Sequence, residues 1–83
     1  MDVAWTPTAK RALVRLPEKV AIALIEFVYG PLAENPRRAG KPLRFELEGL
    51  DSARRGDFRV IYRIGEHVTI MAIDHRFDVY RTS

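Results

Sequence analysis

Residues 51–66 read DSARRGDFRVIYRIGE and contain two turn signals that set the architecture of the chain. Gly56 and Gly65 each begin a two-residue hairpin turn between segments in which apolar and polar residues alternate. In the middle segment an apolar face alternates with a face that carries Arg59 and Arg63, so one face is expected in the core and the other is expected to be cationic. The pattern predicts three consecutive antiparallel strands, at about 51–55, 58–64 and 67–74.

The N-terminal third has helical periodicity instead. A short strand at 3–5 is followed by Thr6, a hydroxyl N-cap, and by a proline at the first helical position. The first helix is expected to run to about Leu16. Pro17 then starts a second helix, which should stop or kink at Gly30 and the proline after it.

The remaining segment, 33–40, contains the pair Arg37-Arg38 and is expected to be a solvated loop or a frayed helical end. A chain of 83 residues cannot fill two cores, so residues 1–83 are expected to form one domain. The predicted fold class is α+β: an N-terminal helical hairpin packed on a small, mainly antiparallel β-sheet, whose other face is open and basic.

Composition excludes several classes of protein. With 47% hydrophobic and 30% charged residues the chain is expected to be compact, and without cysteine it has no disulfide or thiolate chemistry. No apolar run approaches the roughly 20 residues of a membrane span, and the first residues lack the layout of a signal peptide. We therefore expect a soluble, cytoplasmic protein that does not bind a membrane.

The net charge of +3 is unevenly distributed. Residues 1–36 are balanced, whereas residues 37–83 carry nine arginines and a lysine against seven acids. A guanidinium offers a planar fork of donors that suits phosphate and stays charged near neutral pH. An anionic partner is one interpretation, and a soluble surface whose arginines pair with nearby acids is the other.

Five residues could assemble an active site on or beside the basic face: Arg54, Arg59, His75, Arg76 and Tyr80. The first two lie on opposite arms of one hairpin, as direct or diagonal cross-strand neighbours, where their repulsion would be relieved by a bound phosphate or by nearby acids. A histidine can exchange a proton near neutral pH, an arginine stabilises phosphate and a tyrosine stacks on a base, which together suit RNA cleavage without a metal. The histidine and tyrosine equally fit structural roles. No metal site or cofactor is expected, because the two histidines are separated and no carboxylate cluster is evident.

Several segments, in this order and spacing, resemble the RelE/ParE toxin superfamily over nearly the whole chain. The most specific is SARRGDFRVIYRI at 52–64, completed by DHRFDVYR at 74–81. The others are TAKRAL at 8–13 followed by Leu16-Pro17, LAENP at 32–36 and GKPL at 40–43.

The resemblance implies a toxin that enters the ribosomal A site and cuts mRNA without a metal, and a cognate antitoxin protein that wraps the toxin and blocks its basic face. By position, Arg59 would hold the scissile phosphate, Arg76 would stabilise it or assist the leaving group, and Tyr80 would orient or stack the nucleotide.

The chain departs from the best-studied branch of the superfamily at two positions. Leu50 and Ser52 stand where that branch has two lysines, one of which is the general base. Arg54 or His75 could substitute, and the histidine has the more suitable intrinsic pKa. The chain also ends three residues after Tyr80, where many members continue into a helix.

Two alternatives remain open from the sequence. A ParE-like toxin would share the fold and inhibit DNA gyrase, although the retained arginines and tyrosine favour RNA cleavage. An attenuated toxin would act only as a binding module, which the missing lysine pair permits.

Overall fold

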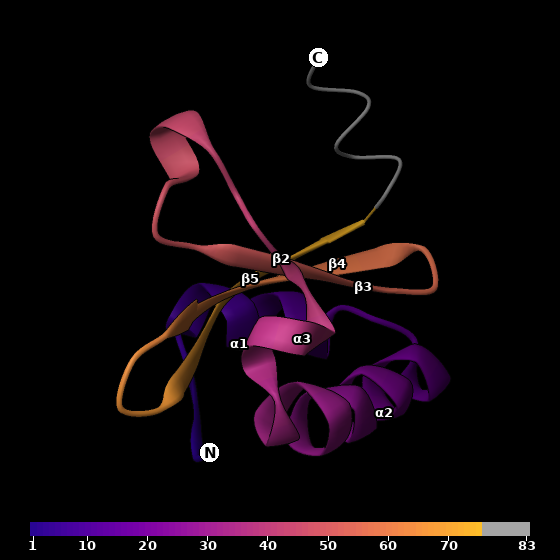
Figure 1. The fold of residues 1–83 in the computed structure, drawn as a ribbon. Coiled ribbons are helices and arrows are strands. Elements are labelled where there is room, and N and C mark those ends of the chain that lie inside the picture. The colour runs from indigo at the N-terminus through magenta and orange to yellow at the C-terminus, as the bar shows by residue number, and fades with distance from the viewer. Residues whose placement is uncertain (76–83) are drawn as a thin grey trace.

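The computed structural model describes residues 1–75, in which one five-stranded sheet has helices packed on one face (Figure 1). The strand order is β1-β5-β4-β3-β2, with β1 parallel to β5 and the other neighbours antiparallel. The strands are β1 (Val3–Trp5), β2 (Lys41–Pro42), β3 (Asp51–Arg55), β4 (Phe58–Ile64) and β5 (Val68–His75). The predicted α+β class is confirmed, and no helix within this range is long and apolar enough to cross a membrane.

The helical layer begins where the N-cap signal predicts. The Thr6 hydroxyl accepts a hydrogen bond from the Ala9 N–H at 3.1 Å and starts α1. This helix ends before the predicted Leu16. The helices are α1 (Pro7–Val14), α2 (Glu18–Phe27) and α3 (Pro36–Ala39), with a π-helical turn at Val28–Leu32.

Arg37 and Arg38 were expected in a loop or a frayed helical end, and the structure has a separate short helix there. These residues lie in α3, a short helix whose N-cap is Asn35. The Asn35 side chain accepts a hydrogen bond from the Arg38 N–H at 3.3 Å, with a proline at the first helical position. Both arginines are exposed, so the change of secondary structure leaves them on the surface.

The core lies between the sheet and the helices. Val60 and Tyr62 are fully buried on the helix-facing side of β4, whereas Arg59 and Arg63 are exposed on the other side. The Tyr62 hydroxyl donates a hydrogen bond to the Pro36 carbonyl and so links β4 to α3. Burial, with a smaller contribution from a nearby acid, raises the pKa of Tyr62 to about 12.

A β-bulge at Met71 divides β5 into two halves. Ile61 pairs with Ala72 and Tyr62 pairs with Ile70, so Met71 is an extra residue without a partner on β4. The extra residue shifts the alternation of β5 by one position. The bulge therefore decides which of the last residues of β5 face the helices.

The connection from β2 to β3 projects from the side of the sheet opposite the helices (Figure 1). It is closed by a 2.8 Å hydrogen bond from the Leu43 N–H to the Leu50 carbonyl and contains a 3-10 turn at Phe45–Leu47. Phe45 is 90% exposed and has a φ of 61°, in the left-handed region. This conformation is uncommon for a bulky residue and costs free energy.

At position 45 glycine is expected to give a more stable protein than alanine, by about 1 kcal/mol. Alanine keeps the Cβ that disfavours the left-handed conformation, while neither substitution removes packing, because the phenyl ring is exposed. Urea unfolding of Phe45→Gly and Phe45→Ala measures the difference. If the alanine variant were the more stable of the two, the backbone at position 45 would not be in the left-handed region.

Candidate functional site

Two arginines meet on the face of the sheet that the helices leave open. Arg54 and Arg59 are direct cross-strand partners in the β3–β4 ladder, which is the closer of the two arrangements that their places on the hairpin allow. Their neighbours Ala53 and Val60 form the adjacent pair and are buried against the helices, so strand alternation turns both arginines outward. We refer to Lys41, Ser52, Arg54, Arg59, Ile61, Arg63 and Asp74 together as the arginine face, because the register places them all on this side.

The arginine pair brings two positive charges together on the open face of the sheet. Within residues 1–75 the guanidinium groups of Arg54 and Arg59 form no hydrogen bond or ion pair, and both side chains are exposed. Like charges directly opposite each other in a sheet are destabilising. A phosphate bound between them would remove this repulsion and accept hydrogen bonds from both forks.

Asp74 is a member of the arginine face that simple alternation along the sequence does not predict. It is the partner of Arg59 on β5 and is half-buried. Counting alternate residues from Val68 assigns position 74 to the core. The bulge at Met71 reverses this assignment, because Ile73 then packs in the core and the next residue turns outward. A carboxyl group thus lies beside the arginine that is predicted to hold phosphate.

His75 lies on the opposite side of the sheet from Arg59, so the expectation that it joins the arginines is wrong. It pairs with Phe58, and the two rings meet edge to face with centroids 4.7 Å apart. The physical reason is again alternation, since β5 continues through His75 and Asp74 already occupies the outward position. The other two predicted site residues, Arg76 and Tyr80, lie outside the described residues.

The rest of the arginine face extends the positive surface along the strands. Lys41 is opposite Ser52 on the β2–β3 pair, and Arg63 is opposite Thr69 on the β4–β5 pair. Between them Ile61 is only 8% exposed although it faces away from the helices. The alternation in β4 predicts the position of Arg63, whereas the short edge strand that carries Lys41 has no clear sequence signal.

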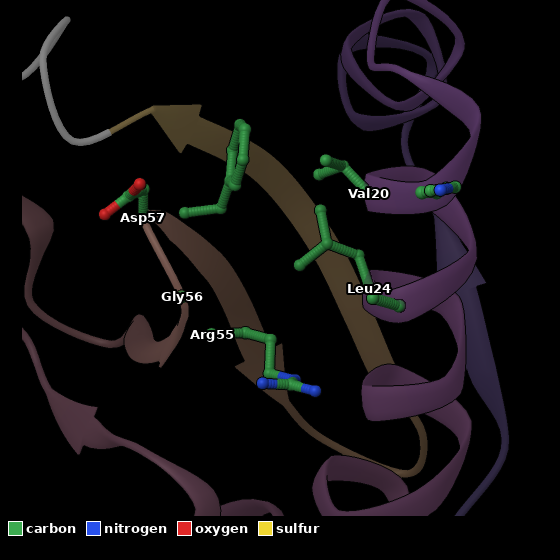
Figure 2. A pocket seen from close by; sticks show the side chains of 8 residues that line it. Val20, Leu24, Arg55, Gly56 and Asp57 are labelled. Carbon is green, nitrogen blue, oxygen red and sulfur yellow. The ribbon is translucent and has the colours of Figure 1, made fainter.

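A separate groove lies on the helix side of the same hairpin. Figure 2 shows Val20 and Leu24 on α2 opposite the turn that carries Arg55, Gly56 and Asp57. The groove has a volume of about 310 Å³, and its lining also includes Lys19, Ala23 and Phe58. Because Arg55 pairs with Phe58, it turns toward this groove and not toward the arginine face.

Within residues 1–75 no three side chains of the types that bind metal ions, namely His, Cys, Asp and Glu, gather into a possible metal site. The arrangement instead offers guanidinium groups and a carboxyl group on an exposed sheet. Chemically, such a surface can bind a phosphodiester and place a proton acceptor next to it.

Comparisons with known proteins agree with this fold. Residues 3–80 match the family described as the ParE toxin of type II toxin–antitoxin systems, parDE. Two curated toxins of Mycobacterium tuberculosis are similar over 82 residues, or 95% of this chain: toxin RelE is 61% identical over 84% of its length, and toxin RelG is 51% identical over 94%. A crystal structure of the toxin–antitoxin complex RelBE2 from the same organism contains a chain that superposes with a TM-score of 0.84 at 49% identity, covering 89% of this chain and 95% of that one.

Proposed function

Because this chain belongs to the RelE/ParE superfamily of type II toxins, we propose that it is an endoribonuclease that cuts messenger RNA in the ribosomal A site, without a metal ion, and so stops translation. The observation that carries the proposal is the pair of exposed guanidinium groups, Arg54 and Arg59, which lie opposite each other on the open sheet face. An exposed concentration of arginine is suited to the phosphate backbone of RNA.

In the proposed reaction the RNA 2′-hydroxyl loses a proton and its oxygen attacks the adjacent phosphorus. The bond from phosphorus to the 5′-oxygen then breaks, and that oxygen takes up a proton. Arg59 holds the phosphate, and Arg54 adds positive charge as the crowded phosphorane forms. By resemblance, Arg76 assists the departing oxygen and Tyr80 stacks on the nucleotide.

The residue that accepts the proton must differ from the lysine of the best-studied branch, because this chain has Leu50 and Ser52 at the two lysine positions. We assign this role to Asp74, since the register places its carboxyl group on the arginine face directly beside Arg59. Carboxylates are established general bases. His75 packs on Phe58 at the other side of the sheet, and its proposed role is to position the chain that continues to Arg76.

The proposed partners follow from the same family. A relative of known structure, 49% identical to this chain, was crystallised as a complex of toxin and antitoxin. We propose that a cognate antitoxin binds this chain and neutralises it until the antitoxin is lost. The proposed target, the translating ribosome with its mRNA, places the activity in the cytoplasm.

Expression of the chain alone is expected to arrest growth with protein synthesis failing first, and co-expression of the cognate antitoxin should restore growth. Pulse labelling of protein, RNA and DNA after induction tests the order of failure. Early loss of DNA replication or supercoiling, with protein synthesis continuing, would replace the nuclease proposal with inhibition of DNA gyrase, the activity of ParE-like toxins. Growth that continues at full expression would indicate an attenuated binding module.

A further inference from the structure

The connection between β2 and β3, residues 43–50, carries a phenyl ring that does not pack into the core. Phe45 is 90% exposed, and no other large apolar side chain within residues 1–75 is as exposed. Its φ of 61° adds the cost of a left-handed backbone to the cost of an apolar ring in water. A residue that is unfavourable to folding in both respects points to a role in binding.

Hydrogen bonds within the loop hold Phe45 in a defined position. The Leu43 N–H donates to the Leu50 carbonyl at 2.8 Å and closes the base of the loop. Nearer the tip, the Glu48 N–H donates to the Phe45 carbonyl at 3.1 Å. Because these bonds already order the backbone, a ligand that contacts the ring would cost little additional backbone entropy.

The loop stands on the same side of the sheet as the arginine face (Figure 1). It enters β3 at Asp51, and Arg54 follows on the same strand. At about 3.3 Å per residue, the base of the loop lies roughly 10 Å along the strand from the pair of Arg54 and Arg59. An RNA strand whose phosphate lies between these arginines can therefore extend along the arginine face to the loop.

The charge of the loop indicates which part of an RNA it suits. Residues 43–50 contain Arg44 against Glu46 and Glu48, so their net charge is negative and they do not suit phosphate. The phenyl ring instead offers a flat apolar face, on which unpaired RNA bases commonly stack in proteins. The open side of the sheet thus presents a site for phosphate at one end of β3 and a site for a base at the other.

We propose that Phe45 stacks on an unpaired RNA base and so helps to hold the RNA on the arginine face, an inference that rests on the nuclease function proposed above. The base belongs either to the mRNA beside the scissile nucleotide or to ribosomal RNA beside the A site. Phe45 is a positioning residue, because it lies away from the arginines that hold phosphate. An apolar protein surface is a poorer fit, since the exposed apolar area of Phe45 and Leu47 is far below that of a protein interface.

The test is the equilibrium affinity for purified ribosomes programmed with an mRNA that has 2′-deoxynucleotides in the A site, because such an mRNA lacks the attacking hydroxyl. Phe45→Leu keeps an apolar side chain and removes the aromatic ring, so the dissociation constant should rise about tenfold or more. Phe45→Tyr keeps the ring and should bind like the wild type. Leu47→Ala, in the same loop, is the matched control and should change the affinity by less than about threefold.

Abasic mRNAs distinguish the two sources of the base. If Phe45 stacks on an mRNA base, removal of that base should weaken binding of the wild type and should have no further effect on Phe45→Leu. If Phe45 stacks on ribosomal RNA, each abasic mRNA should affect the wild type and Phe45→Leu equally, and Phe45→Leu should remain the weaker binder.

Equal affinity of the wild type and Phe45→Leu would overturn the proposal. So would a loss in Phe45→Leu that Phe45→Tyr shares or that Leu47→Ala matches, because the aromatic ring would then not be the feature recognised. Circular dichroism melting verifies that the variants remain folded, as the exposure of both positions predicts. A wild type that binds programmed ribosomes and leaves ordinary mRNA intact would refute the nuclease proposal alone, whereas a wild type that does not bind them would overturn both.

Discussion

Replacing Arg59 by alanine is expected to slow single-turnover mRNA cleavage on programmed ribosomes by about a hundredfold, equivalent to about 3 kcal/mol of transition-state stabilisation. Arg59 lies between Arg54 and Asp74 in the sheet and carries the charge nearest to both. Its side chain is exposed and has no hydrogen bond or ion pair within residues 1–75, so the variant should melt like the wild type. The loss should appear in the rate at saturating ribosome concentration.

Arg37→Ala is the control for a general loss of charge. Arg37 is an exposed arginine of α3 in the helical layer, and its removal should change the cleavage rate by less than about threefold. Equal losses at Arg37 and Arg59 would show that positive charge acts diffusely and that the arginine face is not a site.

The same assay separates the roles of the two residues at the end of β5. Asp74→Asn should reduce the rate strongly if Asp74 takes the proton from the 2′-hydroxyl, because an amide cannot accept that proton. His75→Gln should lower the rate with the pH profile retained, because His75 contacts Phe58 on the other side of the sheet. A normal rate in Asp74→Asn would leave that carboxylate as a neighbour that only balances the charge of Arg59.

The substitution Gly40→Ala is expected to cost about 2–4 kcal/mol of folding free energy, because position 40 has no room for a side chain. A Cβ atom there would lie 2.4 Å from the Ser52 carbonyl oxygen and 2.6 Å from the Tyr62 hydroxyl. Backbone on one side and a fully buried ring on the other leave little freedom to relax. A domain of this size has a free energy of unfolding of only about 4–12 kcal/mol. The substitution would therefore remove a large fraction of the stability of the protein.

Urea unfolding measures this effect, with Gly65→Ala as the matched control. A Cβ atom at position 65 would have its nearest neighbour, the His67 carbonyl oxygen, at 3.8 Å, which is an ordinary contact. This control should stay within about 1 kcal/mol of the wild type. If Gly40→Ala were as stable as the wild type, β3 and Tyr62 would not pack closely around position 40.

Much of the sheet could be predicted from the sequence because its turns are local. Gly56 and Gly65 fix two hairpins, and once a hairpin register is set, strand alternation determines the face of each residue. For this reason the opposition of Arg54 and Arg59, and the division of β4 into a buried and a cationic face, follow from counting residues.

The end of β5 could not be predicted in the same way. The bulge at Met71 inserts one residue, and nothing in the sequence IMAIDH distinguishes a bulged from a regular strand. One inserted residue exchanges the two faces, so His75 turns inward and Asp74 turns outward. Alternation counted without the bulge therefore assigns both residues to the wrong face of the sheet.

Other differences arise where tertiary contacts override local preference. The segment around Arg37 forms a helix of only four residues, which is too short to be stable alone. It is held by the cap from Asn35 and by the hydrogen bond of Tyr62 to Pro36, a residue 26 positions earlier in the chain.

The most direct measurement of the proposed nuclease activity is primer-extension mapping of mRNA 5′ ends in a purified translation system to which the protein is added. The expected result is a set of new 5′ ends within codons that occupy the ribosomal A site, which depend on ribosomes and disappear with Arg59→Ala. Intact mRNA in the presence of folded wild-type protein and translating ribosomes would contradict the proposal that this chain cuts mRNA.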